Sequence, residues 1–274
     1  TVLSIGPSFV VIIPHKDRFF GKDVAMFFNC LYCGFFGFSM RMFVIIFAYR
    51  LFVATESQIL KYFEGSKILL WFGYPLSHLI IFTTVAYGPF SPFPEMDKFV
   101  STDIQETLNM SLDDVTYTGP LFYSPLTNEV RMTTMVVSLL QYIFTTSSLL
   151  LVIIFGFKCY FCVMKIVQIQ DSLSLKLRNL QKQLFVALVF QALVPLILMH
   201  IPVTILYTCS LLSLNFNPFS VSTTIALFPA LDPFPTIFIV KTYRMTVMGY
   251  FNWIFRCRHP KPKEVSVKME SRGL

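Results

Sequence analysis

Residues 184–231 run for 48 positions without one formally charged side chain. The hydrocarbon core of a bilayer is about 30 Å thick, and one helix needs roughly 20 apolar residues to cross it. The run is therefore long enough for two crossings. Its polar, turn-forming segment, residues 215–218, lies near the middle, where a short loop would reverse the chain. This feature predicts a helical protein that spans a membrane several times.

The composition agrees with that prediction. Apolar residues make up 55% of the chain, charged residues only 14%, and the mean hydropathy is +0.65. Spans are expected at about 24–50, 68–87, 132–157, 184–212 and 219–240. Each must be helical, because an isolated strand would leave backbone groups unpaired in lipid. We expect an all-α integral membrane protein, with a helical bundle over 1–244 and a basic tail over 245–274.

The basic residues between the spans predict how the chain is oriented. Loop 88–131 carries two basic and seven acidic residues, whereas loop 158–183 carries five basic residues and one acidic residue. The segment after Val240 carries eight basic and two acidic residues. Cytoplasmic loops are enriched in Lys and Arg, so loop 88–131 is expected outside, and loop 158–183 and the tail inside. The net charge of +7 thus reflects membrane topology, and the expected partner is a lipid bilayer rather than a nucleic acid.

Two features belong to the expected outer side. Asn109 begins an N-glycosylation sequon in loop 88–131, where a glycosylating enzyme would reach it. Residues 2–14 are apolar but too short to cross a bilayer, so we interpret them as the outer end of another helix. Residues 15–23 would then form a short outer loop, and the simplest account is a chain whose N-terminal helices are missing.

Five segments carry a resemblance to a known family, in the same order along the chain. They are residues 47–50 (FAYR), 63–67 (FEGSK) with Trp71, 113–123, 180–202 and 228–244. Together they resemble the nematode serpentine chemoreceptors of the Str group. The resemblance implies a rhodopsin-like bundle of seven spans, of which five are present here, in a G-protein-coupled chemosensory receptor. It also implies a multi-pass location in the plasma membrane of sensory cilia.

Apart from Arg50 at the inner end of the first span, Arg41 and Asp232 are the charged residues within the predicted spans. A charge at such depth costs at least ~2.5–3.5 kcal/mol unless it is paired or near water, so both are candidate functional residues. Counted from the outer side at ~1.5 Å per residue, they lie at similar depths. We hypothesise that they form an ion pair. Alternatively, Arg41 extends to the inner surface while Asp232 is protonated or hydrogen-bonded.

Prolines mark candidate hinges in the last two spans. Asp232-Pro233 lies where, by the resemblance, receptors carry an Asn/Asp-Pro switch in the last helix, and Pro195 and Pro202 interrupt the preceding span. Proline removes a backbone hydrogen bond and bends a helix. These sites are therefore candidate switches, or else ordinary kinks.

Candidate coupling residues lie at the inner side. Tyr49-Arg50 occupies, by the resemblance, the place of an acid-Arg-Tyr triplet, although a lone Arg there could equally be a topology anchor. Leucines at 173, 177, 180 and 184 form a stripe on a predicted helical extension. Such a stripe suits a helix of a heterotrimeric G protein, or is simply a solvated helix end.

The cysteines do not predict a metal site or any other cofactor site. Cys30 and Cys33 have zinc-like spacing, as do Cys159 and Cys162, but the two pairs lie at opposite sides of the membrane. Cys257 follows the last span and is flanked by arginines, which suits palmitoylation. No motif of a known catalytic site is present, so we expect no enzyme.

The outer halves of the spans predict a small, weakly polar, odorant-like ligand within the bundle. The candidate lining residues are Phe28, Tyr32, Phe36, Ser77, Gln141, Tyr142 and Tyr207. His78 and His200 could also face a pocket. Two alternatives remain open: a truncated receptor product that does not signal, and a transporter or channel subunit, which would carry internal repeats and more polar spans.

Overall fold

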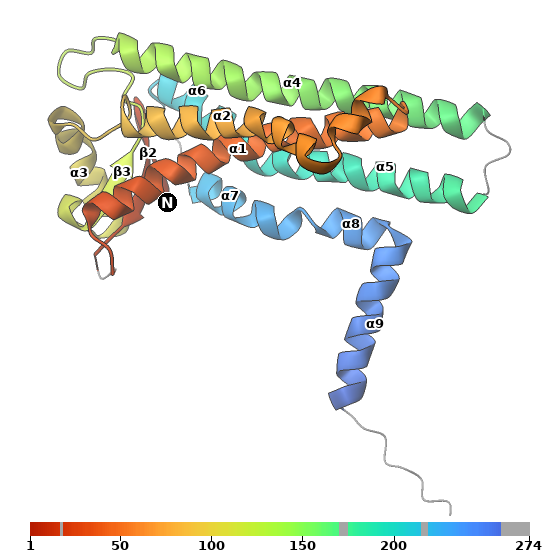
Figure 1. The fold of residues 1–274 in the computed structure, drawn as a ribbon. Coiled ribbons are helices and arrows are strands. Elements are labelled where there is room, and N and C mark those ends of the chain that lie inside the picture. The colour runs from red at the N-terminus through yellow and green to blue at the C-terminus, as the bar shows by residue number, and fades with distance from the viewer. Residues whose placement is uncertain (17–18, 170–174, 215–218, 259–274) are drawn as a thin grey trace, which may run out of the picture.

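The computed structural model describes residues 1–16, 19–169, 175–214 and 219–258, and is almost entirely helical (Figure 1). Within these residues, five stretches are long and apolar enough to cross a membrane. They are Lys22–Ala54, Gly65–Tyr87, Met132–Cys162, Phe185–Leu211 and Val221–Ile239. The expectation of an all-α membrane bundle with five spans is confirmed.

The surface of the bundle is that of a lipid-facing protein. Large apolar side chains point outward along several spans, each more than half exposed, as at Leu69, Ile80, Ile143, Phe157 and Ile197. Contiguous apolar surface of this kind is rare on soluble monomers. In a bilayer this surface contacts acyl chains, so its exposure does not cost the free energy of hydrating apolar groups.

The first three long helices are α1 (Lys22–Ala54), α2 (Ile68–Tyr87) and α4 (Met132–Ile169). Short 3₁₀ turns, η1 (Gln58–Tyr62) and η2 (Gly65–Lys67), join α1 to α2. In Figure 1 these helices lie side by side along the length of the bundle.

Two glycines allow α1 and α2 to approach closely. A Cβ atom at Gly34 would lie 2.1 Å from the Thr83 hydroxyl and 2.8 Å from the Leu79 carbonyl oxygen. At Gly37 it would lie 2.8 Å from the Phe82 ring. Small residues at helix interfaces serve this purpose in membranes, where packing rather than water exclusion holds helices together.

The fourth span is continuous but distorted. It consists of α5 (Leu175–Pro195), a π turn, η4 (Leu196–His200), and α6 (Ile201–Leu211). The π turn lies between Pro195 and Pro202, so the distortion expected at these prolines takes the form of one wide turn. An extra residue in the turn rotates the side chains on either side of it.

The fifth span is broken at Asp232-Pro233. α7 (Phe219–Leu231) ends directly before these two residues and α8 (Phe234–Ile239) begins directly after them. Beyond α8, α9 (Lys241–Arg258) turns away from the bundle (Figure 1).

The prediction that residues 2–14 form the end of a helix is wrong. They form a β-hairpin of β1 (Val2–Ile5) and β2 (Ser8–Pro14), and β2 pairs antiparallel with β3 (Val115–Thr118). Gly6, with φ +48°, takes the first central position of the two-residue turn, and proline follows it. A positive φ at that position is the pattern of a type II′ hairpin turn.

The segment between α2 and α4 completes a compact unit with the hairpin. It contains α3 (Pro94–Leu108), the 3₁₀ turn η3 (Leu112–Asp114) and β3. We call residues 1–14 and 88–131 the cap. The cap lies at one end of the bundle; η1 and η2 lie near the other, which we call the connector end (Figure 1).

Both faces of the hairpin are buried, so its sequence has the pattern of a buried helix as well as that of a strand. Val10 and Ile12 pack against Met96 and Val100 of α3, whereas Phe9, on the opposite face, packs toward the helices. A strand buried on both faces reads as an unbroken apolar run, and periodicity alone does not distinguish that run from a buried helix.

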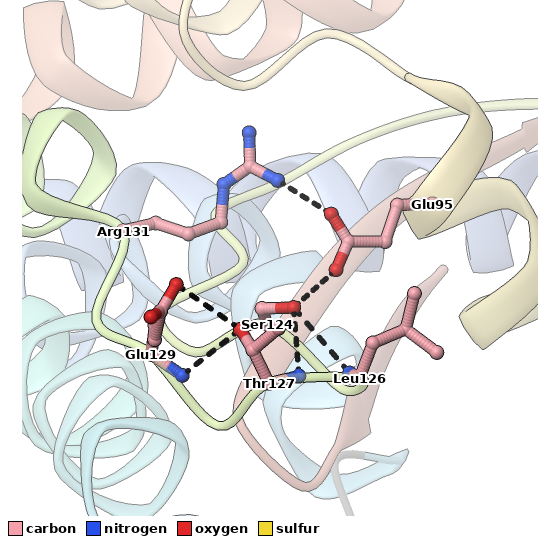
Figure 2. Close-up of polar contacts among 6 residues, drawn as sticks. All are labelled: Glu95, Ser124, Leu126, Thr127, Glu129 and Arg131. Atoms are coloured by element: carbon pink, nitrogen blue, oxygen red, sulfur yellow. Dashed lines mark hydrogen bonds and ion pairs between the residues drawn. The ribbon is translucent and has the colours of Figure 1, made fainter.

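Charged and hydroxyl groups join α3 to the start of α4 (Figure 2). Arg131 Nη1 lies 3.1 Å from Glu95 Oε2, and the Ser124 hydroxyl donates to Glu95 Oε1. The Arg131 guanidinium also lies 4.0 Å from the centre of the Phe93 ring. These contacts fix the loop before α4 against the N-terminus of α3.

Candidate functional site: a cavity beneath the cap

A cavity of about 110 Å³ lies between the cap and the helices. It is lined by side chains of α1, α2, α4, α6 and α7, by the π turn, and by the cap. The volume is similar to that of an engineered apolar cavity of about 150 Å³ that binds benzene. The cavity therefore has the size for a small molecule.

Five of the predicted lining residues line this cavity: Tyr32, Phe36, Gln141, Tyr142 and Tyr207. Two others do not. Phe28 is 49% exposed and lies edge-on to Phe27, with ring centres 5.8 Å apart. The Ser77 hydroxyl donates back to the Tyr74 carbonyl, 2.7 Å away, at the surface of α2.

The residues that form the roof of the cavity were not predicted from the sequence. Val2, Phe9 and Val11 of the hairpin line it, together with Thr118 and Gly119 at the end of β3. A strand with one buried face would show apolar and polar residues in alternation along 8–14. Both faces of this strand are apolar, so the sequence does not show that alternation.

Gly119 is the point at which the roof closes. A Cβ atom there would lie 2.0 Å from the Phe9 carbonyl oxygen, so only glycine fits. The preceding Thr118 hydroxyl donates to the carbonyls of Ala86, at 2.8 Å, and Phe90, at 3.0 Å. On the other side, the Asn29 side chain donates to the Val11 carbonyl at 2.8 Å, which ties β2 to α1.

The cap is also hydrogen-bonded to the last two spans. The Val2 amide donates to the Ser222 hydroxyl of α7 at 2.8 Å. The Ser210 hydroxyl of α6 donates to the Ser8 carbonyl at 3.3 Å, and the Tyr123 hydroxyl donates to the Leu211 carbonyl at 3.1 Å. The roof is thus connected to helices on both sides of the cavity.

Few polar groups face the cavity. The Tyr207 hydroxyl donates to Gln141 Oε1 at 3.2 Å, and the Tyr207 ring lies edge-on to Phe9 at 4.7 Å. His200, on the π turn, lines the cavity and is 7% exposed, whereas His78 does not line it. No Asp, Glu, Lys or Arg is among the described residues that line it. The site suits a neutral ligand with a small polar part.

The predicted Arg41–Asp232 ion pair is wrong. Within the described part of the chain, the ion pairs are Lys16–Asp114 and Arg131–Glu95, both of which involve the cap. The Asp232 Oδ1 atom is buried without a hydrogen-bond partner among those residues.

Arg41 instead joins three helices. It is 4% exposed, and its guanidinium donates to the Tyr74 hydroxyl of α2 and to two groups of α4. These are the Phe144 carbonyl, at 2.7 Å, and the Ser147 hydroxyl, at 3.2 Å. The Tyr74 ring centre lies 5.0 Å from the guanidinium carbon, close enough for a cation–π interaction. Neutral acceptors and an aromatic ring thus surround the buried charge.

At the connector end, two of the motifs that carry the family resemblance meet. The Tyr49 ring lies 5.2 Å from that of Phe63, and Phe63 stacks on Trp71 at 4.2 Å. Arg50 is exposed beside them. Part of the predicted leucine stripe, at residue 173, lies outside the described residues. Cys257 falls in the last turn of α9, where side chains are not described.

Asp114 and Tyr117 are ionisable groups of the cap with shifted pKa values. The Ser111 hydroxyl, and after it Lys16, lower the pKa of Asp114. Burial, and then a 2.5 Å hydrogen bond to Asp97, raise the pKa of Tyr117. Asn109, the sequon residue, is exposed at the end of α3 with φ +53°.

Comparison with known proteins identifies relatives across almost the whole chain. The profile of the serpentine type 7TM GPCR chemoreceptor family Str matches residues 1–248. The chain is 59% identical over 250 residues to the G-protein coupled receptor str-217 of Caenorhabditis elegans, a match that covers 91% of this chain and 73% of that receptor. No solved structure matches the chain.

Two more distant relatives are serpentine receptors of class r-10. Identity is 29% to the Caenorhabditis briggsae protein and 27% to the Caenorhabditis elegans protein. Each match covers 81% of this chain and 66% of the relative. The matched family is one of receptors, not of enzymes. On this match and the five-span helical fold, the chain belongs to the Str family of serpentine seven-transmembrane G-protein-coupled chemoreceptors.

Proposed function

We propose that this chain is a chemosensory receptor that binds a small, weakly polar, odorant-like molecule in the cavity beneath the cap. The observation that carries the proposal is the cavity itself: an apolar space with a few hydrogen-bonding groups, enclosed among the spans of a chemoreceptor-family chain. Ligand sites of proteins commonly have this character. The volume favours ligands of about the size of a single ring.

We propose that the ligand signal reaches a heterotrimeric G protein at the connector end. In this arrangement the acidic cap faces outside and the basic loop 158–183 faces the cytoplasm, in the plasma membrane of sensory cilia. Tyr49 and Arg50 lie at the proposed coupling surface. Arg41, the π turn between Pro195 and Pro202, and the break at Asp232-Pro233 are the proposed switch elements.

Two modifications fit this orientation. Asn109, exposed on the cap, would be glycosylated in the lumen during synthesis. Cys257, near the end of α9, would be palmitoylated at the cytoplasmic face, which would hold α9 against the membrane.

Ligand-driven nucleotide exchange tests the proposed function. Membranes that contain the chain are mixed with a purified heterotrimeric G protein and exposed to a panel of small volatile molecules. We expect a subset of the panel to raise the exchange rate, and Arg50→Glu to abolish the increase while ligand binding is kept. An exchange rate that no volatile changes, for any G-protein class and with the chain at the cell surface, would contradict coupling.

A further inference from the structure

The π turn brings a histidine to the wall of the cavity. His200 is the last residue of η4 (Leu196–His200), lines the cavity and is 7% exposed. π turns inside α-helices occur frequently at functional sites. His200 lies within residues 180–202, one of the segments that carry the family resemblance, and the resemblance gives this side chain no role.

The surroundings of the His200 ring determine which nitrogen carries the hydrogen. His200 Nδ1 lies 3.5 Å from the Pro195 carbonyl oxygen. A carbonyl oxygen only accepts hydrogen bonds, so we assign the ring hydrogen to Nδ1, the tautomer that can donate to it. A second proton on the ring would place a charge in the apolar bundle with no described acidic residue at the cavity wall, at a cost of ~2.5–3.5 kcal/mol or more. The neutral ring therefore presents a lone pair at Nε2.

That lone pair has no partner in the described part of the chain. His200 Nε2 is buried, and no hydrogen bond satisfies it there. Because Nδ1 is turned toward its own helix, Nε2 lies on the far side of the ring from Pro195. An unsatisfied buried polar atom costs about 1–3 kcal/mol. A donor on a bound molecule would remove that cost.

Gln141 supplies the complementary group. Its Oε1 accepts from Tyr207, while its amide nitrogen, which has two hydrogens, makes no hydrogen bond with the described residues. The residue is 5% exposed and lines the same cavity. The wall thus offers an acceptor at His200 and a donor at Gln141, besides the hydroxyl groups of Tyr142, Thr146 and Thr204. A ligand hydroxyl can donate to the first of these.

We propose that His200 selects the ligand by accepting a hydrogen bond from it, and that the preferred ligands are small neutral alcohols. Hydrocarbons and carbonyl compounds of the same skeleton leave Nε2 unpaired and bind more weakly. This inference rests on the proposed function, because it requires the cavity to be the ligand site. It adds the chemical class of the ligand and the residue that recognises it.

Binding to three probes of matched shape tests the inference. Benzyl alcohol, benzaldehyde and toluene are titrated against the purified chain in one detergent, and binding is followed by ligand-observed NMR. We expect the wild type to bind the alcohol about fivefold more tightly than either other probe, since one neutral hydrogen bond contributes about 1 kcal/mol and 1.4 kcal/mol is tenfold. His200→Phe and His200→Leu should lose this preference, and His200→Gln, which keeps an acceptor, should retain part of it.

His78 provides a matched control. Its Nδ1 lies 3.2 Å from the Tyr74 carbonyl, its Nε2 is also buried without a described partner, and it is also 7% exposed. Since it does not line the cavity, His78→Phe should leave the alcohol preference unchanged. Comparison of variants in one detergent also cancels the partitioning of the probes into micelles.

The failure of this inference can be told apart from the failure of the proposed function. If the three probes bind the wild type equally, or the preference survives in both His200→Phe and His200→Leu, His200 is not the selecting residue and the cavity remains the ligand site. If none of the probes binds a folded wild type, both the alcohol preference and the ligand-binding role of the cavity are contradicted.

Discussion

Gly119, directly after β3, lies against the backbone of β2 at Phe9. Gly119→Ala would place a methyl group 2.0 Å from the Phe9 carbonyl oxygen, so β2 or β3 must move. We expect a loss of stability of about 1–3 kcal/mol, visible as a lower melting temperature of the purified chain. Gly73→Ala, where a Cβ atom meets nothing within 4 Å, is the control and should melt like the wild type. Equal melting of both variants would show that the cap does not close as described.

Arg41 holds its place through the shape of its side chain as well as its charge. Arg41→Lys keeps the charge, but one ammonium group cannot reach the Tyr74 hydroxyl and the two α4 groups together. We expect a loss of about 2 kcal/mol, since each hydrogen bond to a charged group contributes roughly 1.5–3 kcal/mol. Ser147→Ala removes one longer contact and should lose less. Chemical unfolding in detergent measures both, and an unchanged Arg41→Lys would refute the three-helix junction.

Asp114 makes part of the stability of the cap depend on pH. Its pKa is lower in the folded chain than in the unfolded chain, so its contribution is present above the ordinary carboxyl pKa and is lost as the pH falls through the lowered value. Between about pH 5 and pH 2, we expect the melting temperature of Asp114→Asn to fall less than that of the wild type. Asp113→Asn is the neighbouring control. Parallel pH curves for Asp114→Asn and the wild type would contradict this role.

At the scale of the elements, the break between α7 and α8 is the clearest candidate hinge. Pro233→Ala restores a backbone donor and should extend α7 into α8, which would reduce ligand-evoked nucleotide exchange several-fold with surface delivery unchanged. Pro229 lies inside α7 without ending it, so Pro229→Ala serves as the control and should change exchange less. Equal effects of the two variants would remove any special role for the break.

The positions of the five spans could be predicted from the sequence, because they depend on the length and apolarity of each segment. A lipid-spanning helix has no other way to satisfy its backbone, so uncharged runs of about 20 residues locate the five spans. The hairpin was not predicted because the elements that it packs against, α3 and β3, lie about 100 residues further along the chain. The contacts of Arg41 were not predicted because its acceptors are hydroxyl groups and a helix carbonyl, which carry no charge. Asp232 was predicted as its partner because it is the acidic residue within the spans.

Most of the aromatic and polar residues that were predicted to line the cavity do line it. Tyr32, Gln141 and Tyr207 line it as expected. Phe28 was misplaced because depth in the membrane alone does not tell which way a helical side chain faces. The roof and the chemistry of His200 depend on strand pairing and on a π turn, which local sequence does not specify.

At the scale of the whole molecule, the two ends of the bundle differ in charge and in form. The cap end is folded into a small sheet and carries the acidic loop, while the connector end carries basic residues and α9. The cavity lies just beneath the cap, so any molecule that fills it touches the cap, α4 and α6 together. This arrangement can link ligand binding at one end to the helices that reach the other.

The central claim is that an activating ligand occupies this cavity, and a cavity-filling variant tests it most directly. Thr146 of α4 lines the cavity, whereas Ile143 of the same helix is 58% exposed and faces outward. Nucleotide exchange is measured against ligand concentration for the wild type, Thr146→Phe and Ile143→Phe, each at matched surface level. The account predicts a response at least tenfold weaker for Thr146→Phe and an unchanged response for Ile143→Phe. A full response from Thr146→Phe would place the ligand elsewhere.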